Sequence, residues 1–373
     1  MDSRELVVVS GAVIASRLFD VADTIDLAKA ETLWAQQLRA ALSRGRLVST
    51  PPKAVAFGVP PLDIPLDPVR IVLDGVVVPA DPVLRLYDFG VARLGLRIAA
   101  ENLSWRDFTR RLIAVDRSVG PAAGNAIWTE LLDQVRATFG PAFLRASLPS
   151  LEEDYLIGLV RSFDETPSAE DLLARIDLVP LLSGEERPLS EGARRDLLRQ
   201  RFSYYADDLV VLTWDRAFIY EPRGDSDVVD VLDVANAQLL EMRYYDELLD
   251  VELPRMYDLV EATQRARPLL GSRRFANLAR RLYGLVAEVT ELREKVDNAL
   301  QVTEDVYLAR IYAAALDLFR VAAVSAAVDR KLAIIRETYT ALYDEASSGR
   351  AALMEATIVV LIVIEIVLAL VRP

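Results

Sequence analysis

The sequence predicts an α+β protein with an N-terminal mixed α/β domain, a helical hairpin or coiled-coil bundle, and a single C-terminal transmembrane helix. Three observations predict this fold class. Strand-like and helix-like runs are mixed over residues 1–225, whereas helical periodicity dominates residues 226–347. Residues 348–373 end in ATIVVLIVIEIVLALVRP, a nearly uniform run of Ile, Val and Leu. We take these three ranges as the domains of the chain.

The first half of the N-terminal domain alternates strands and helices. LVVVSGAVIASRLF opens it as a strand, and helical spacing follows over residues 27–42. Two strand-like runs, VRIVLDGVVVP and VLRLYDFGVARLGLRIA, are separated by the turn residues Pro79, Asp81 and Pro82. Ser104 precedes WRDFTRRLIAVD and has the chemistry of a helix N-cap. This order predicts an open sheet with helices on one face.

The rest of this domain is less regular. The segments GPAAGN, ETPSAED and LSGEERPLSEG interrupt residues 116–200, so we expect loops between short helices there. AVAFGV is compatible with a short strand. FSYYADDLVVLTWDRAFIYEP, residues 202–222, predicts one or two strands with a turn near Trp214 and Asp215.

Three apolar stripes at helical spacing predict the helical domain. The third stripe alternates steps of three and four residues without a break, as in a coiled coil. We expect Pro254, Pro268 and Gly271 to break the helices, which gives an antiparallel hairpin or bundle. A stripe of this kind serves either as core packing within the chain or as a surface for self-association. The stripes are Leu232, Ala235, Leu239, Met242, Tyr245 and Leu249; Leu278, Leu282, Leu285, Val289, Leu292 and Val296; and Ile311, Ala314, Leu318, Val321, Ser325, Val328, Leu332, Ile335, Tyr339 and Leu342.

The C-terminal segment has the length and composition of a membrane span. Residues 351–371 would form a helix of about 31 Å, which covers a bilayer core. Residues 358–371 contain twelve Ile, Val and Leu side chains, which favour insertion by about 4 to 7 kcal/mol. The central Glu365 opposes insertion by roughly 2.5 to 3.5 kcal/mol. Insertion is therefore favoured over the alternative, a buried core helix, and nearly the whole chain would lie on the cytoplasmic side of a bacterial inner membrane.

The position of Glu365 also bears on assembly. Steps of three and four residues from Glu355 reach Ile358, Ile362, Glu365 and Ala369, which form one narrow seam. The other faces carry Val, Ile and Leu and suit lipid. A carboxyl group on such a seam should meet protein or water, which predicts a homo-oligomer. The alternative is a single span that tolerates one protonated glutamate.

Composition excludes several classes of site. The chain has no histidine and no cysteine, so it cannot build a Ser-His-Asp triad, a His-ligated zinc site or a disulfide. Its net charge of -13 argues against a nucleic-acid partner, because such proteins neutralise phosphates. No loop has the spacing of a phosphate-binding motif. We therefore expect no catalytic residue and no cofactor.

One acidic group could ligate a metal ion. Its carboxylates are oxygen ligands of the kind that Mg²⁺ and Ca²⁺ prefer. A solvated helix face, or pairing with Arg243 and Arg255, is the alternative. The group consists of Glu241, Asp246, Glu247 and Asp250.

The C-terminal half carries a family resemblance. The runs QLLEMRYYDELLDVELPRMYDLVE and KLAIIRETYTALYDEASSGRAALMEATIVVLIVIEIVLAL resemble the YagE-like proteins, relatives of the proteins required for meiotic nuclear division and a family of unknown function. The matching positions are Met354 with Glu355, residues 358–364, and Glu365, whereas Ala356 replaces an aromatic residue. The resemblance implies a membrane-associated, self-assembling protein without known catalysis.

These observations favour one function over two others. We expect a tail-anchored, self-associating scaffold or adaptor with an unknown protein partner and no enzymatic activity of its own. The alternative is an oligomeric cation-conducting or gating protein with CorA-like architecture, in which a ring of Glu365 would attract cations. A single span and the lack of a Gly-Met-Asn loop argue against it. An enzyme that uses carboxylates alone is the third hypothesis.

Overall fold

The structure is a computed structural model that describes residues 5–41, 59–124, 126–147, 151–185, 187–224, 227–264 and 306–371, with isolated positions between 277 and 290. Within its helices, the side chains of residues 37–41, 259, 262–264, 342, 345–356 and 368–371 fall outside the description. The chain forms two compact units, Met1–Glu241 with Lys295–Ala322, and Met242–Glu294 with Ala323–Pro373. A large sheet and many helices confirm a mixed α and β fold.

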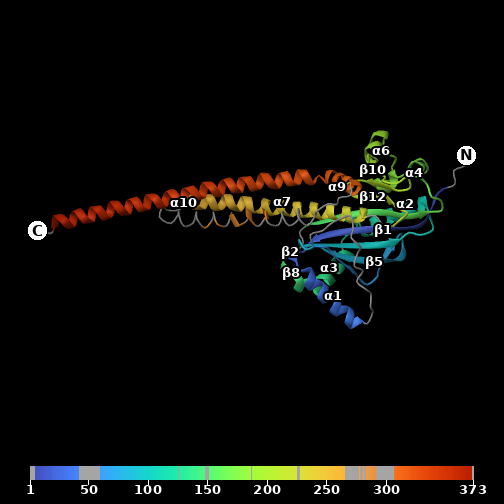
Figure 1. Cartoon of the computed structure of the whole chain (residues 1–373), viewed down its shortest axis with the longest axis horizontal. Helices are drawn as coiled ribbons and strands as arrows, with labels where there is room; N and C mark the ends of the chain where they lie inside the picture. Colours follow the sequence, from blue (N-terminus) through green and yellow to red (C-terminus); the bar gives the residue numbers. More distant parts are fainter. Residues whose placement is uncertain are drawn as a thin grey trace. The chain divides into compact units, whose positions relative to one another are not determined.

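The first unit is built on a ten-stranded sheet with the order β10-β11-β12-β9-β1-β6-β5-β3, in which β4 pairs with β5 and β7 with β1. Figure 1 labels β1, β5, β10 and β12 of this sheet. Neighbouring strands are antiparallel except β12 and β9, which are parallel. A second, two-stranded sheet joins β2 to β8. The strands are β1 (Val7–Asp20), β2 (Ala22–Ile25), β3 (Leu62–Pro65), β4 (Val69–Leu73), β5 (Val76–Leu86), β6 (Val91–Ala99), β7 (Leu103–Ser104), β8 (Phe143–Ala146), β9 (Glu152–Phe163), β10 (Gln200–Phe202), β11 (Leu209–Leu212) and β12 (Arg216–Tyr220).

The helices alternate with these strands and then follow them. They are α1 (Leu27–Ala41), α2 (Trp105–Val119), α3 (Ala126–Phe139), α4 (Ala169–Arg175), α5 (Val179–Ser183), α6 (Glu191–Leu197), α7 (Val228–Gln264), α9 (Val306–Leu318) and α10 (Val321–Val371), with the short 3-10 helices η1 (Pro121–Ala123) and η2 (Gly140–Ala142).

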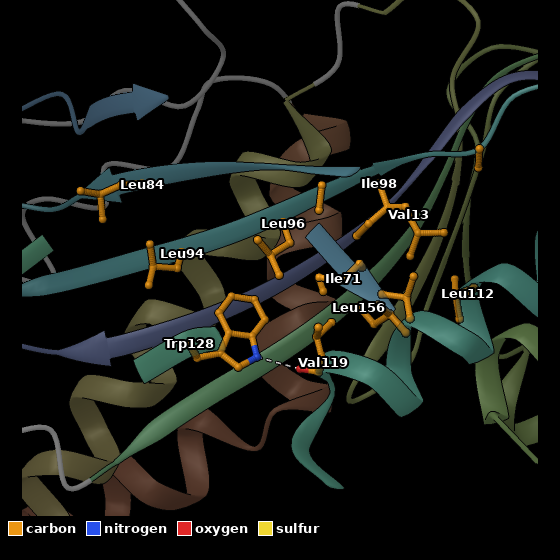
Figure 2. Packing of buried hydrophobic residues seen from close by; sticks show 14 of the residues in the cluster. Val13, Ile71, Leu84, Leu94, Leu96, Ile98, Leu112, Val119, Trp128 and Leu156 are labelled. Carbon is orange, nitrogen blue, oxygen red and sulfur yellow. Dashed lines mark hydrogen bonds between the residues drawn. The ribbon is translucent and has the colours of Figure 1, made fainter. Parts of the chain in front are cut away.

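One face of the sheet packs against helices through apolar side chains. Trp128 of α3 is buried there, and its indole N–H donates to the carbonyl of Val119 at 2.7 Å (Figure 2). Leu112 of α2 belongs to the same buried cluster. Gly158 of β9 permits this packing, because a Cβ there would lie 3.0 Å from Leu112 Cδ1 and 3.3 Å from Phe108 Cε1. This face holds the main core of the unit.

The opposite face packs against α7, so the prediction of helices on one face only is wrong. Leu18 of β1 and Val91 of β6 form a small buried cluster with Val234 and Leu240 of α7. Side chains alternate between the two faces along a strand, and the sequence offers apolar residues on both faces of β1. Such a strand is covered twice, as in a sheet between two layers of helices.

Several predicted elements are confirmed. The helix predicted over residues 27–42 is α1. Ser104 caps α2, where its Oγ accepts from the backbone N–H of Asp107 at 3.1 Å. The turn predicted near Trp214 and Asp215 separates β11 from β12.

The predicted turn at Pro79, Asp81 and Pro82 is wrong. β5 runs through all three residues, and its turn lies earlier at Asp74 and Gly75, with φ of 48° and 83°. β5 pairs with β4 as far as Ala80 and with β3 from Val83 onward. Pro82 lies where the strand changes partner, and Pro79 lies opposite Arg70 of β4 before β5 pairs with β6 from Asp81 onward. One edge of β5 is therefore outside the β6 ladder at Pro79, a position that tolerates a missing N–H.

The expectation of loops and short helices over residues 116–200 is wrong at β9. This strand is a direct neighbour of the central strand β1. Residues 155–160 are all buried, so the strand lacks the alternation that identifies a half-exposed strand. Most of the short strand considered at AVAFGV lies outside the described residues.

The second unit contains the later part of α7 and most of α10. Lys331 of α10 pairs with Asp246 at 2.6 Å and with Asp250 at 2.7 Å. Val328 and Leu332, both of the third predicted stripe, are buried within the single chain. This burial favours core packing over self-association as the role of that stripe.

The helices of the C-terminal half differ from expectation at two breaks. α7 continues through Pro254, which removes one helical hydrogen bond without ending the helix, so the predicted break is wrong there. A break lies instead between α9 and α10, where Arg320 has a φ of 57°. Pro268, Gly271 and the second stripe except Val289, which is buried, lie outside the described residues.

The predicted transmembrane helix is not supported by the structure. Among the residues whose side chains are described, no single helix is both long and apolar enough to cross a membrane, although α9 and Val321–Ala341 of α10 pass that test together. The apolar stretch described near the C-terminus is shorter, Thr357–Val367. The side chains on either side of this stretch in α10 lie outside the described residues. The full segment predicted to span the membrane, residues 351–371, is therefore not tested.

Candidate binding pocket

A tight loop after β10 carries two exposed tyrosines. The Asp208 carboxylate accepts the backbone N–H groups of Tyr204 at 2.7 Å and Tyr205 at 3.1 Å. The backbone N–H of Ala169 donates to the carbonyl of Ala206 at 2.8 Å, which ties the loop to the start of α4. These bonds hold the loop backbone, and the rings of Tyr204 and Tyr205 stay 63% and 45% exposed.

The loop forms one wall of a cavity of about 180 Å³ in the first unit. Tyr204 packs edge-on against Tyr205, with ring centroids 4.8 Å apart, and lies 5.4 Å from the ring of Tyr307 in α9. The guanidinium of Arg223 lies 3.8 Å from the centre of the Tyr205 ring. The lining residues are Tyr204, Tyr205, Asp207, Asp208, Val210, Tyr220, Glu221, Pro222, Arg223, Asp227, Val228, Tyr307 and Leu308.

The lining carries more negative than positive charge. Among the described lining residues, four carboxylates face one arginine, Arg223. Glu221 pairs with Arg161 at 3.4 Å, at the edge of the cavity. The buried Tyr220 has its pKa raised by burial and by the negative charge of Asp207. The cavity is therefore an electronegative pocket with aromatic walls.

This arrangement offers groups for binding. Carboxylates and aromatic faces attract cations. The raised pKa of Tyr220 keeps its hydroxyl group protonated near neutral pH, so it can donate a hydrogen bond but is a poor general base. The pocket thus has the chemistry of a recognition site.

The acidic residues considered as metal ligands have other partners. Asp246 and Asp250 pair with Lys331. Glu241 is buried, and Glu241 and Glu247 each make an interaction of their own. Among the residues that the structure describes, no group of three or more acidic side chains is placed to hold a metal ion.

The residues of the predicted intramembrane seam all lie in α10. Ile358, Ile362 and Glu365 are exposed. The side chains of Glu355 and Ala369 lie outside the described residues. The structure therefore brings none of the described seam side chains together with a partner inside the chain.

The pocket was missed in the sequence, where FSYYADD reads as the start of a strand. An adjacent pair of tyrosines before two aspartates is a sign of a loop, because aspartate favours turns. Arg223 and Tyr307 complete the pocket from distant parts of the chain. Nothing in their local sequence distinguishes them.

Comparison with known proteins identifies one family. A family model described as "Uncharacterized protein MJ0711, N-terminal domain" matches residues 10–227. The uncharacterized protein MJ0711 of Methanocaldococcus jannaschii is 26% identical over 196 residues, which cover 52% of this chain and 59% of that relative. The chain thus matches less than two thirds of the relative's length. No solved structure matches the chain.

The resemblance to the YagE-like family is wrong, because the family model and the relative both identify MJ0711. That resemblance depended on residues 200–373, whereas the family match covers residues 10–227. A run of Ile and Val around a glutamate is a pattern of composition that unrelated apolar helices share. The matched region contains most of the pocket lining and ends where α7 begins.

Proposed function

The chain belongs to the family of the MJ0711 N-terminal domain, and from this premise we propose that it is a non-catalytic, self-associating adaptor that is tethered to a membrane by the end of α10. The electronegative pocket of the first unit receives the partner. The proposal concerns the whole chain, including the part beyond the family match.

The observation that carries the proposal is the exposure of the apolar end of α10. From Ile358 to Val367, every residue except Glu365 is Ile, Val or Leu, and each of these side chains is 49% to 59% exposed. A helix that is apolar all round requires a core or a lipid phase around it. A second copy of the helix would cover one stripe only. Lipid is therefore the occupant that suits the remaining faces.

Glu365 supports the proposed self-association. A carboxyl group in a lipid phase is costly, and helices with such groups pair so that the polar group meets protein or water. Ile362 and Ile358 lie on the same side of the helix as Glu365, about one and two turns before it. This side is the proposed contact between copies.

The pocket supports an adaptor rather than an enzyme. Its aromatic rings and carboxylates bind charged groups, and the chain lacks the histidine and cysteine on which many acid-base and nucleophilic sites depend. A chain that binds a partner through its first unit and lipid through the end of α10 brings the partner to the membrane.

Vesicle flotation tests the tether. The full chain is expected to float with liposomes, whereas the double variant Ile362→Asp and Val363→Asp should remain at the bottom, because each central aspartate costs roughly 2.5 to 3.5 kcal/mol. Val76→Asp is the matched control, since Val76 is 63% exposed in the β4–β5 hairpin. A wild-type chain that never floats contradicts the membrane tether.

Light scattering behind a sizing column tests the assembly. In mild detergent the chain is expected at a defined multiple of 41.4 kDa. Glu365→Leu should insert normally but change that multiple. A monomer would contradict self-association. Cation flux through the same liposomes that disappears in Glu365→Gln would replace the adaptor with the cation-conducting alternative.

A further inference from the structure

We propose that the electronegative pocket binds an organic cation of side-chain size, that is, an alkylammonium or guanidinium group. The inference rests on the proposed role of this pocket as the receiving site, and it names the chemical class that the pocket takes. Charge, aromatic walls and volume each support it.

The charge of the lining selects a cation. Asp207, Asp208, Glu221 and Asp227 face the cavity, and Arg223 is the single basic residue among the lining residues that the structure describes. Asp208 is bonded to two backbone N–H groups, and Glu221 pairs with Arg161. Asp207 is half-buried and has no hydrogen bond or ion pair with any residue that the structure describes. Its carboxylate is therefore placed to pair with an incoming cation.

The aromatic walls suit the same class of ligand. Arg223 lies 3.8 Å from the centre of the Tyr205 ring, well within the range of about 6 Å for a cation–π contact. The protein thus already stabilises a guanidinium on one ring of this pocket. Tyr204 and Tyr307, whose rings lie 5.4 Å apart, provide two further rings. An incoming cation would rest on these rings or take the place of Arg223.

The volume limits the size of the ligand. A cavity of about 180 Å³ is smaller than the roughly 300 to 1,000 Å³ of pockets for drug-sized ligands. It holds the end of a lysine or arginine side chain but not a nucleotide, and its carboxylates would repel phosphate groups. The source of the cation is either a basic side chain of a partner protein or a free polyamine.

Calorimetric titration of the full chain in mild detergent tests the inference. The probes are Nα-acetyl-arginine amide, Nα-acetyl-lysine amide and spermidine, with Nα-acetyl-glutamate amide as the acidic control. We expect the cations to bind and the acidic probe not to bind. Asp207→Asn should weaken cation binding about ten-fold through the loss of one charge-assisted bond. Arg223→Ala should tighten it, because the resident like charge is gone.

Matched variants separate this effect from damage to the fold. Glu130→Gln removes an exposed carboxylate of α3 outside the pocket and should leave binding unchanged. Thermal unfolding must be alike for all variants. Tighter binding of spermidine identifies a free polyamine as the source, and tighter binding of a capped amino acid identifies a partner's side chain.

Two results would overturn the inference. One is the absence of cation binding by both the wild type and Arg223→Ala. The other is cation binding that Asp207→Asn leaves unchanged or that the acidic probe matches. The titration requires no membrane, so a chain that binds cations but fails to float or assemble contradicts the proposed function alone. A chain that floats and assembles without binding cations contradicts this inference alone.

Discussion

The two faces of the large sheet are covered by different chemistry. Toward α2 and α3, the contacts are mainly apolar and include the fully buried Trp128 and Leu112, with the buried Arg17 lying over the Trp128 ring. Toward α7, two buried arginines of the sheet pair with acids of the helix. Arg93 lies 3.2 Å from Asp233, and Arg85 lies 2.7 Å from Asp230. Arg85 also forms a bidentate pair with Asp63 of β3 at 2.6 and 2.8 Å.

The two kinds of contact have different roles: one stabilises the first unit, and the other fixes the position of α7 on the sheet. Apolar contacts are non-directional and stabilise in proportion to the area that they bury. Buried ion pairs are directional, and the cost of desolvation offsets much of their attraction. Burial opposes the charge of Arg85, but its hydrogen bonds with Asp63 and the charge of Asp230 raise the pKa of the guanidinium. The apolar contacts on both faces, including the cluster of Leu18, Val91 and Val234 toward α7, therefore stabilise the unit. The ion pairs fix where α7 lies along the sheet.

The largest expected effect is on the apolar face. Trp128→Ala should lower the free energy of unfolding of the first unit by about 3 to 5 kcal/mol, because it leaves a cavity and removes one of the two side-chain hydrogen bonds to the carbonyl of Val119. All four tryptophans of the chain lie in this unit, so urea unfolding followed by tryptophan fluorescence reports on it. Trp214→Ala is the control, since Trp214 is 72% exposed. Equal losses in the two variants would contradict the assignment of the core.

On the face toward α7, the largest loss of stability is expected when a buried charge loses its partner. Asp233→Leu leaves Arg93 without its carboxylate and should cost about 3 kcal/mol, at the low end for breaking a buried pair because Arg85 keeps Asp63 and Asp230. Adding Arg93→Met should restore much of the loss, since two apolar groups replace a buried pair at little cost. The same fluorescence titration measures both variants. A double variant less stable than the single one would show that the pair itself stabilises the unit.

A third prediction concerns pH and the buried Asp20 at the end of β1. Burial, and then the charge of Asp23, raise the pKa of Asp20 to about 7. Because the folded state holds this proton more tightly than the unfolded state, the stabilisation is complete below about pH 4 and is lost as the pH rises to 7. The loss is at most about 4 kcal/mol. Asp20→Asn should flatten the stability of the first unit between pH 4 and 7. An unchanged slope in this variant would assign the pH dependence to other groups.

The smallest effect is expected from an exposed pair of the second unit. Asp250→Asn breaks its contact with Lys331, but the Asp250 side chain is 62% exposed and Lys331 keeps Asp246. Exposed pairs contribute about 0 to 1 kcal/mol. Hydrogen exchange of the α7 amides should therefore change little, and less in high salt. A loss of stability above 1 kcal/mol in Asp250→Asn would show that the exposure of Asp250 does not explain why its effect is smaller than that of Asp233→Leu.

Local patterns predicted those parts of the fold that depend on local chemistry. The cap at Ser104 and the turn at Trp214 follow from residue types a few positions apart, and both are confirmed. β9 was missed because a strand that is buried on both sides has no period of two. The turn at Pro79 was misplaced because proline interrupts a central ladder but is tolerated at a strand edge, and β5 pairs with β6 only from Asp81 onward.

The pocket depends on contacts that no local pattern encodes. Tyr204, Arg223 and Tyr307 meet only after the sheet and α9 have folded. The pairing of Asp246 with Lys331 is likewise a contact over a long sequence distance. Composition could show that acids outnumber bases, but not which acids face a common cavity.

The position of β1 has a consequence for synthesis. β1 is made before its main neighbours in the sheet, which are β6, from Val91, and β9, from Glu152. At roughly 5 to 20 residues per second, the ribosome completes the start of β9 about 7 to 30 s after β1 emerges. During that interval a long apolar strand has at least one open edge, which can pair with other chains. The yield of folded protein therefore depends on events during translation. Slower initiation at low temperature keeps nascent chains apart and should increase this yield.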